Sequence, residues 1–451
     1  MYGRWVRASA AAVAAWWLVV SAGIASAHGA VGGGFEAPIP LWLLYVGAGG
    51  TVAVTAGWLA VGGADRTDRH GARTVTVPFW AGQALRNVGR VLGLFALVAV
   101  LATGLAGPQV AAENVATVLF WPVWLKGLGL LAVLVGSPWG VLSPWGTLYA
   151  AVSRLEGTPP RLLGAYPDRL GEWPAVVGFA LLVGLVENLT TLPRSPRLTA
   201  VVVAGYALAM LLGALAYGPA WLRHADVFAV LYRQLGRVAP LSVTAADGGY
   251  RLALRTPWVA CTRPVTGAST VAFVVLALYT VSFDGLTETA PFQSAVVAVP
   301  TGPTAAAVGL YLGGFGLFLM SYRAAVAVVG RVGGGRRPAA AFAASLLPIA
   351  AAYEVAHVYP FVLRNLGTLG VLLTAEAVTV APVAGLSTGV FWASQVALVV
   401  GGHLVAVAAA HLVAVDRYGP AEARRAHLPL VAVMVGYTVC SLWIISQPVV
   451  N

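Results

Sequence analysis

Charged residues and cysteines are scarce in this 451-residue chain. Only 10% of the residues are charged, 59% are hydrophobic, and the mean hydropathy is +0.82. A soluble domain carries about 25% charged residues and cannot cover this much apolar surface, so a soluble globular protein is excluded. The two cysteines, Cys261 and Cys440, lie far apart and form no Cys-x-x-Cys pair, which argues against a disulfide framework or a thiolate metal site.

Long apolar runs occupy most of the chain. Each run of about 20 residues can cross a hydrocarbon core about 30 Å thick, whereas a barrel would show alternating polarity in shorter segments. The sequence therefore predicts an all-α polytopic transmembrane helix bundle, with the lipid bilayer as its first partner. The expected spans are 39–62, 91–110, 117–136, 173–191, 198–219, 266–283, 303–330, 339–359, 386–415 and 428–447. The shorter stretch 368–383 is interpreted as a re-entrant or interfacial piece.

The amino terminus has the pattern of a secretory signal peptide over residues 1–27. Arg4 and Arg7 precede an apolar stretch that ends in Ala25-Ser26-Ala27, a small-x-small cleavage site. Cleavage there would make His28 the first residue of a mature chain, 28–451, that forms a single membrane helix bundle. The alternative is an uncleaved first helix.

Arginines fall almost entirely in alternate loops, which indicates orientation. The loops expected to lie inside are 63–90, 136–172, 220–265, 331–338 and 416–427, while those expected outside hold only Arg194, Arg197 and Arg364. By the positive-inside rule this predicts a multi-pass protein of the cell membrane whose mature N-terminus and C-terminus are both outside. The net charge of +11 is thereby explained without a nucleic-acid partner.

Three further features of the sequence carry expectations. The inside loop 220–265 contains ADVFAVLYRQLGRVAPL, whose helical apolar spacing predicts an interfacial helix, followed by a hairpin over DGGYRLALRTPW. The repeated unit in SPWGVLSPWG is typical of interfacial tryptophan anchors. Lys126, the one lysine, is expected either to snorkel or to pair with a carboxylate in the bundle.

A carboxylate and an imidazole share one face of the segment SLLPIAAAYEVAHVYPFVL. Glu354 and His357 are three residues apart, which places them on neighbouring positions of a helix. Ionisable groups at membrane depth are costly and indicate function by default. An E-x-x-H pair on a bundle helix is a known way to present two ligands to a metal. The alternative is a buried hydrogen-bonded pair that joins helices.

Two further histidines lie in a later apolar segment. His403 follows Gly401 and Gly402, which would let a neighbouring helix approach closely. His411 is eight residues on, about 12 Å further along a helix, so the two cannot bind one small ion together. Either they are successive stations on a path, or one of them is a structural histidine.

The predicted topology arranges these groups by depth. Asp284, in VSFDG, is expected near the outer face with Glu354 and His357, whereas His403 lies near the middle and His411 deeper. An N-terminal His28 could add a histidine-brace site for a metal at the outer surface. Imidazole-rich sites suit copper or zinc.

Five segments, in order, carry a family resemblance: HGAVGGGFEAPIPLWLLYVGAG, SPWGVLSPWGTLY, TVSFDGL, SLLPIAAAYEVAHVYPFVL and QVALVVGGHLVAVAAAHLVAVDR. Together they resemble the polytopic bacterial and archaeal membrane proteins labelled fenitrothion hydrolase-like. The resemblance covers most of the chain and implies hydrolysis of organophosphate esters. It transfers no catalytic residue to this sequence.

Several functional hypotheses therefore stand together. The first is transport or handling of a metal cation, with copper the first candidate, through a His/Glu/Asp site that opens to the outer face. The second is a membrane-embedded, metal-dependent hydrolase of small organophosphate-like substrates, in which Glu354 is a base or ligand. The third is a haem-binding electron carrier with two of His357, His403 and His411 as axial ligands. The fourth is an accessory subunit whose buried polar groups are structural.

Overall fold

The computed structural model describes residues 40–62, 74–300, 302–333, 338–374 and 388–447. Within them, ten helices are long and apolar enough to cross a membrane, which confirms the all-α polytopic bundle. Their bounds are Leu41–Ala60, Phe79–Ala106, Val115–Val135, Asp168–Glu187, Pro196–Tyr217, Ala268–Thr287, Pro303–Gly333, Pro338–Thr374, Gly389–Ala426 and Leu428–Ser446. The expected signal peptide and His28 lie outside the described residues.

Two helices extend beyond the spans expected from hydropathy. The second begins at Phe79 rather than near 91, because its first turns carry Arg86 and Arg90 and are too polar for hydropathy to detect. The eighth continues through Pro360 to Thr374, so residues 368–374 belong to this helix and form no separate re-entrant piece. Residues 375–383 lie outside the described part of the chain.

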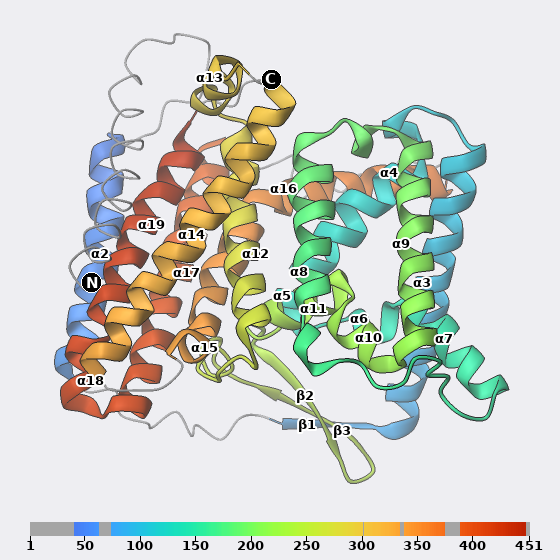
Figure 1. The fold of residues 1–451 in the computed structure, drawn as a ribbon, viewed down its shortest axis with the longest axis horizontal. Helices are drawn as coiled ribbons and strands as arrows, with labels where there is room; N and C mark the ends of the chain where they lie inside the picture. The colour runs from blue at the N-terminus through green and yellow to red at the C-terminus, as the bar shows by residue number, and fades with distance from the viewer. Residues whose placement is uncertain (1–39, 63–73, 301, 334–337, 375–387, 448–451) are drawn as a thin grey trace. The chain divides into compact units, whose positions relative to one another are not determined.

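The chain folds as two compact units (Figure 1). In unit 1, α2 packs against α17 and α19, and α12 packs against α14 and α19. The elements of unit 1 are α2 (Leu41–Gly62), α12 (Ala268–Thr287), α13 (Ala290–Ala298), α14 (Pro303–Gly333), α15 (Pro338–Phe342), the 3-10 helix η6 (Ala343–Leu346), α16 (Leu347–Thr374) as far as His357, α17 (Thr388–Tyr418), α18 (Pro420–Ala426) and α19 (Leu428–Ser446).

One glycine in unit 1 sets a close helix contact. A Cβ placed on Gly402 would lie 2.4 Å from the Ala352 Cβ and 2.8 Å from the Pro348 carbonyl oxygen. Only glycine therefore lets α17 approach α16 at this height, as small residues do in membrane bundles. A Cβ placed on Gly401 would meet no atom within 4 Å, so one of the two glycines makes the approach.

In unit 2, α3 packs against α9, α4 and α6, and α11 packs against α5. The remainder of α16 also belongs to this unit. Its elements are β1 (Thr74–Pro78), α3 (Phe79–Ala106), η1 (Ala111–Glu113), α4 (Val115–Val118), the π-helix η2 (Leu119–Gly127), α5 (Leu128–Val135), α6 (Trp139–Leu142), α7 (Pro144–Leu155), η3 (Asp168–Leu170), α8 (Trp173–Phe179), the π-helix η4 (Ala180–Glu187), η5 (Leu192–Arg194), α9 (Pro196–Tyr217), α10 (Pro219–His224), α11 (Val227–Leu235), β2 (Leu241–Ala246) and β3 (Gly249–Leu254).

Two parts of unit 2 add to the sequence expectations. The hairpin is present as β2 and β3, and β1 joins it to give an antiparallel sheet in the order β1-β3-β2. The helix expected in loop 220–265 is α11, and most of its side chains are buried within the protein, among them Phe228 and Tyr232. The apolar face of α11 thus packs against neighbouring helices.

Candidate functional site

The best-formed polar site of unit 1 joins Asp284 near the end of α12 to His357 on α16. The His357 Nε2 atom lies 3.6 Å from the Asp284 Oδ2 atom, and both side chains are about four-fifths buried, with 21% and 23% exposed. Tyr353, one turn before His357, stacks on the imidazole with 6.3 Å between ring centres. Gly285 makes room for this stack, because a Cβ there would lie 3.0 Å from the Tyr353 hydroxyl oxygen.

Glu288 adds a second carboxylate that the sequence analysis did not single out. It caps the C-terminal end of α12, four residues after Asp284. Burial raises the pKa of the Glu288 carboxyl, the charge of His357 lowers it, and the charge of Asp284 raises it. Two carboxyl groups, those of Asp284 and Glu288, therefore lie near the His357 imidazole. The spacing D-x-x-x-E in SFDGLTE is the signal that could have identified Glu288, since it places both groups on one helical face.

Glu354 lies one turn before His357, as expected, and is buried with 8% exposed. The ion-pair partner of His357 in the structure is Asp284. The structure therefore brings together His357, which lies within an expected span, and Asp284, which follows the end of another, as two residues expected near the same membrane face.

His403 occupies a separate place on α17. It is fully buried, its Nδ1 atom lies 2.8 Å from the Val399 carbonyl oxygen, and its Nε2 atom has no partner. Its ring lies 5.7 Å from that of Tyr437, whose hydroxyl group is hydrogen-bonded to Ser282. Among the described residues, no hydrogen bond, ion pair or ring contact joins His403 to His357 or His411.

His411 forms a pair with His427, a histidine that the sequence analysis treated as a loop residue. The two rings meet edge to face, with 5.0 Å between their centres, and both side chains are buried. The His427 Nδ1 atom lies 2.5 Å from the Ala423 carbonyl oxygen. The His427 Nε2 atom and both nitrogens of His411 have no partner. Three imidazole nitrogens are thus available at one buried point.

Unit 2 holds two further buried polar groups. The Lys126 Nζ atom lies 3.3 Å from the Glu187 Oε1 atom, and both side chains are largely buried, so the carboxylate pairing is confirmed over snorkelling. Lys126 is the last residue but one of the π-helix η2, and Glu187 is the last residue of the π-helix η4. Long π-helices are rare and often mark functional or strained sites. In η2, the Trp124 carbonyl oxygen accepts a hydrogen bond from the Tyr232 hydroxyl at 2.7 Å.

The two tryptophans of SPWGVLSPWG are buried, so the interpretation as interfacial anchors is wrong. Trp139 and Trp145 are 3% and 1% exposed. Both indole N–H groups donate to the Asp226 Oδ2 atom, each at 2.7 Å. A buried indole N–H needs an acceptor, and the Asp226 carboxylate supplies one to both rings.

The positions of the histidine and carboxylate side chains limit how many of them can bind one metal ion. Within the part of the chain that the structure describes, no group of three or more His, Cys, Asp or Glu side chains is placed to hold a metal ion. The histidine and carboxylate groups instead form pairs at separate points of unit 1.

No family model, curated protein or solved structure matches the chain. The resemblance to the fenitrothion hydrolase-like family therefore stays a prediction from the residues. With ten candidate spans in the described residues, the chain is a multi-pass integral membrane protein.

Proposed function

We propose that this membrane protein carries a divalent transition-metal cation along unit 1. The observation that supports the proposal best is the pair His411 and His427, two buried imidazoles that keep three nitrogen atoms without a partner. Buried polar atoms are nearly always bonded, so such exceptions call for an explanation, of which an ion is one. Imidazole ligands favour Cu²⁺ and Zn²⁺, and copper is the first candidate because it binds most strongly in the divalent series.

The spacing of the pair suits a shared ion. A tetrahedral metal about 2.0–2.1 Å from each ring nitrogen would separate two imidazole centres by roughly 5 Å. The rings of His411 and His427 lie 5.0 Å apart. Two protein ligands bind more weakly than the four of a structural zinc site. Incomplete coordination of this kind lets an ion enter and leave, as conduction requires.

Asp284 and His357 are the proposed entry site, and Glu288 adds a second carboxyl group nearby. Two ligand atoms bound to one tetrahedral metal lie roughly 3.4 Å apart if each bond is about 2.0–2.2 Å long. The 3.6 Å between the His357 Nε2 and Asp284 Oδ2 atoms is close to this value. The negative charge of the two carboxylates attracts a cation, and the topology predicted from the arginines places the site at the outer face. The finer assignment to copper and the His28 brace rest on the sequence alone.

His403 is the intermediate station in this proposal. It is fully buried on α17 with a single available nitrogen, Nε2. It lies eight residues before His411, about 12 Å along the helix axis. The imidazoles are thus distributed along one unit, which favours movement of an ion over a single catalytic centre. No observation among the described residues favours the hydrolase or haem hypotheses.

The test is uptake of Cu²⁺ or Zn²⁺ into proteoliposomes, followed with an entrapped fluorescent indicator. We expect the double variant His411→Ala, His427→Ala and the variant Asp284→Asn each to reduce the initial rate at least tenfold. His224→Ala is the matched control, because His224 is a partly buried histidine of unit 2 that stacks on Tyr166. Uptake by the double variant at the wild-type rate, with wild-type thermal stability, would contradict the proposal.

A further inference from the structure

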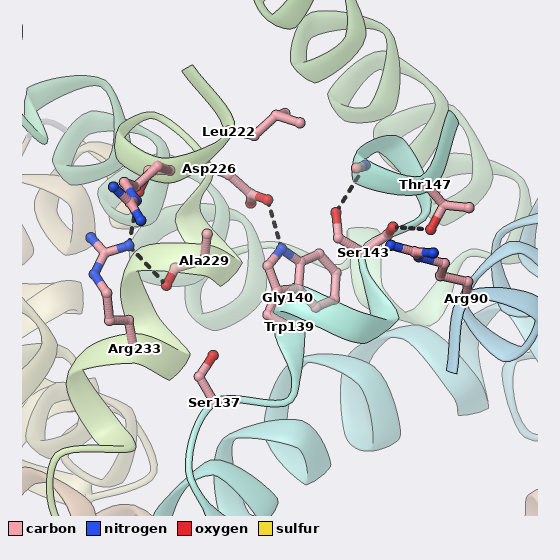
Figure 2. Close-up of a pocket in the computed structure, with 12 residues that line it drawn as sticks. Arg90, Ser137, Trp139, Gly140, Ser143, Thr147, Leu222, Asp226, Ala229 and Arg233 are labelled. Atoms are coloured by element: carbon pink, nitrogen blue, oxygen red, sulfur yellow. Dashed lines mark hydrogen bonds between the residues drawn. The ribbon is translucent and has the colours of Figure 1, made fainter. Parts of the chain in front are cut away.

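An open cavity of about 410 Å³ is formed by residues of unit 2. Three arginines from three helices line it: Arg90 on α3, Arg223 on α10 and Arg233 on α11. Figure 2 shows Arg90 and Arg233 reaching the cavity from opposite sides, with Trp139 and Asp226 between them. A cavity of this size suits a small ligand or a head group.

Both oxygens of the one carboxylate that lines the cavity already accept hydrogen bonds from the protein. Asp226 accepts hydrogen bonds from Trp139 and Trp145 at one oxygen, and from the Tyr206 hydroxyl and the Phe228 N–H at the other. It therefore offers little to a cation in the cavity. The arginines outnumber it, so the lining is positive overall.

Two of the three guanidinium groups are available. Arg233 is engaged, since it donates to the Glu172 carboxylate and to the Arg223 carbonyl oxygen. The guanidinium groups of Arg90 and Arg223 have no hydrogen-bond or ion-pair partner anywhere in the described ranges. Arginine matches phosphate oxygens with pairs of parallel hydrogen bonds. The charge of the lining therefore favours an anion, and phosphate is a group that arginine side chains bind well.

Hydroxyl groups beside Arg90 complete the polar lining. The Ser143 Oγ atom accepts a hydrogen bond from the Gly146 N–H at 3.1 Å, so its own hydrogen can be donated to a ligand. In Figure 2, Ser143 and Thr147 lie next to Arg90 at one side of the cavity. The Thr147 hydroxyl already donates to the Ser143 carbonyl oxygen at 2.9 Å, so Ser143 is the neutral donor that remains for the anion.

An apolar pocket of about 280 Å³ adjoins the cavity through a shared wall. Trp139 lines both spaces, and α6, of which it is the first residue, separates them. The pocket has an entirely apolar lining that includes Phe95, Ala96, Leu142 and Leu373. A positive cavity and an apolar pocket on either side of one short helix fit a ligand that is itself amphipathic.

We propose that unit 2 binds an anionic phospholipid. Its phosphate lies in the positive cavity beside Arg90 and the Ser143 hydroxyl, with Arg223 adding positive charge from the other side, and one acyl chain occupies the apolar pocket beyond Trp139. Basic pockets between transmembrane helices are known to bind acidic lipid head groups on the inner side of a membrane. The arginine distribution of the sequence predicts that side for residues 63–90 and 220–265, which include Arg90 and Arg223. A free phosphate compound would use the same cavity and would leave the apolar pocket empty.

Native mass spectrometry of the detergent-purified full chain can test this, with phosphatidylglycerol, phosphatidylcholine and inorganic phosphate as probes. We expect one phosphatidylglycerol to bind at least tenfold more tightly than phosphatidylcholine. The double variant Arg90→Ala, Arg223→Ala should lose this preference. Arg86→Ala is the matched control, since Arg86 is also on α3 but lies over the Tyr250 ring rather than in the cavity.

A second variant keeps both arginines and fills the apolar pocket. Ala96→Phe should reduce binding of phosphatidylglycerol several-fold and leave binding of inorganic phosphate unchanged. Inorganic phosphate that binds as tightly as phosphatidylglycerol, with no effect of Ala96→Phe, would overturn the lipid proposal in favour of a soluble phosphate ligand. An equal loss of phosphatidylglycerol in Arg86→Ala would overturn the role of the cavity, because binding would then reflect surface charge alone.

Discussion

Removal of the Asp226 carboxylate tests the interior of unit 2 directly. Asp226 is 1% exposed and caps the N-terminus of α11. Its oxygens accept two indole N–H bonds at 2.7 Å, one from the Tyr206 hydroxyl at 2.9 Å and one from the Phe228 N–H at 3.0 Å. Burial raises the pKa of this carboxyl, while the hydrogen bonds from Trp139, Trp145 and Tyr206 lower it.

The expected cost of Asp226→Ala follows from these bonds. Loss of a helix cap costs about 1 kcal/mol. Each buried donor left without an acceptor costs about 1–3 kcal/mol, and three side-chain donors lose theirs. Because Asp226 and Trp139 line a cavity that has room for water, water can replace part of the lost bonding. We therefore expect the lower end of the sum, about 4 kcal/mol.

Asp226→Asn should cost less, about 1–3 kcal/mol, because its amide oxygen can still accept both indole bonds while its NH₂ group faces the Phe228 N–H. The assay is reversible unfolding in mixed detergent and SDS micelles, followed by tryptophan fluorescence. Trp139→Phe and Trp145→Phe, each combined with Asp226→Ala, complete a double-mutant cycle. Wild-type stability of Asp226→Ala, or additive effects with both tryptophan variants, would refute this account of the interior.

Three further outcomes follow from single contacts. Lys126→Met should destabilise the protein by about 3–5 kcal/mol because it leaves Glu187 buried without its cation, whereas adding Glu187→Leu should recover most of this in the same unfolding assay. Gly402→Ala should destabilise by about 1–3 kcal/mol through overpacking, while Gly401→Ala should be neutral or gain up to about 1 kcal/mol of helix propensity. The raised pKa of Glu288 means that its contribution to stability is complete below the ordinary carboxyl pKa and is lost as the pH rises through the raised value. Glu288→Gln should therefore flatten that part of the plot of stability against pH. An unchanged plot would contradict this role of Glu288.

The membrane fold was largely predictable because the bilayer restricts the alternatives. A long apolar run has to satisfy its own backbone hydrogen bonds and therefore forms a helix. All ten spans are present in the described residues. The ends were less predictable: α3 begins at Phe79 and α16 runs on to Thr374, since hydropathy detects the apolar part of a helix and not its polar turns.

The candidate site was predictable only in part. Asp284 and His357 were singled out because ionisable groups in apolar segments stand out, and the structure places them 3.6 Å apart. His427 and Glu288 were missed because each lies just outside a span, where a charged or polar residue is ordinary. The Asp226 cluster was missed for another reason. Its bonds join residues 87 and 81 positions apart in sequence, and no periodic pattern reports such a pair.

The two units differ in the kind of atom that they leave available. Unit 1 presents imidazole nitrogens at His403, His411 and His427, which donate electron pairs to a cation. Unit 2 presents the N–H groups of Arg90 and Arg223, which donate hydrogen bonds to an anion and cannot bind a metal. One ligand therefore cannot serve both. Arg90→Ala, Arg223→Ala should change lipid binding and leave the metal content of the purified protein unaltered, and His411→Ala, His427→Ala should do the reverse. Loss of both properties in either variant would mean that the two sites are linked through the stability of the fold rather than built independently.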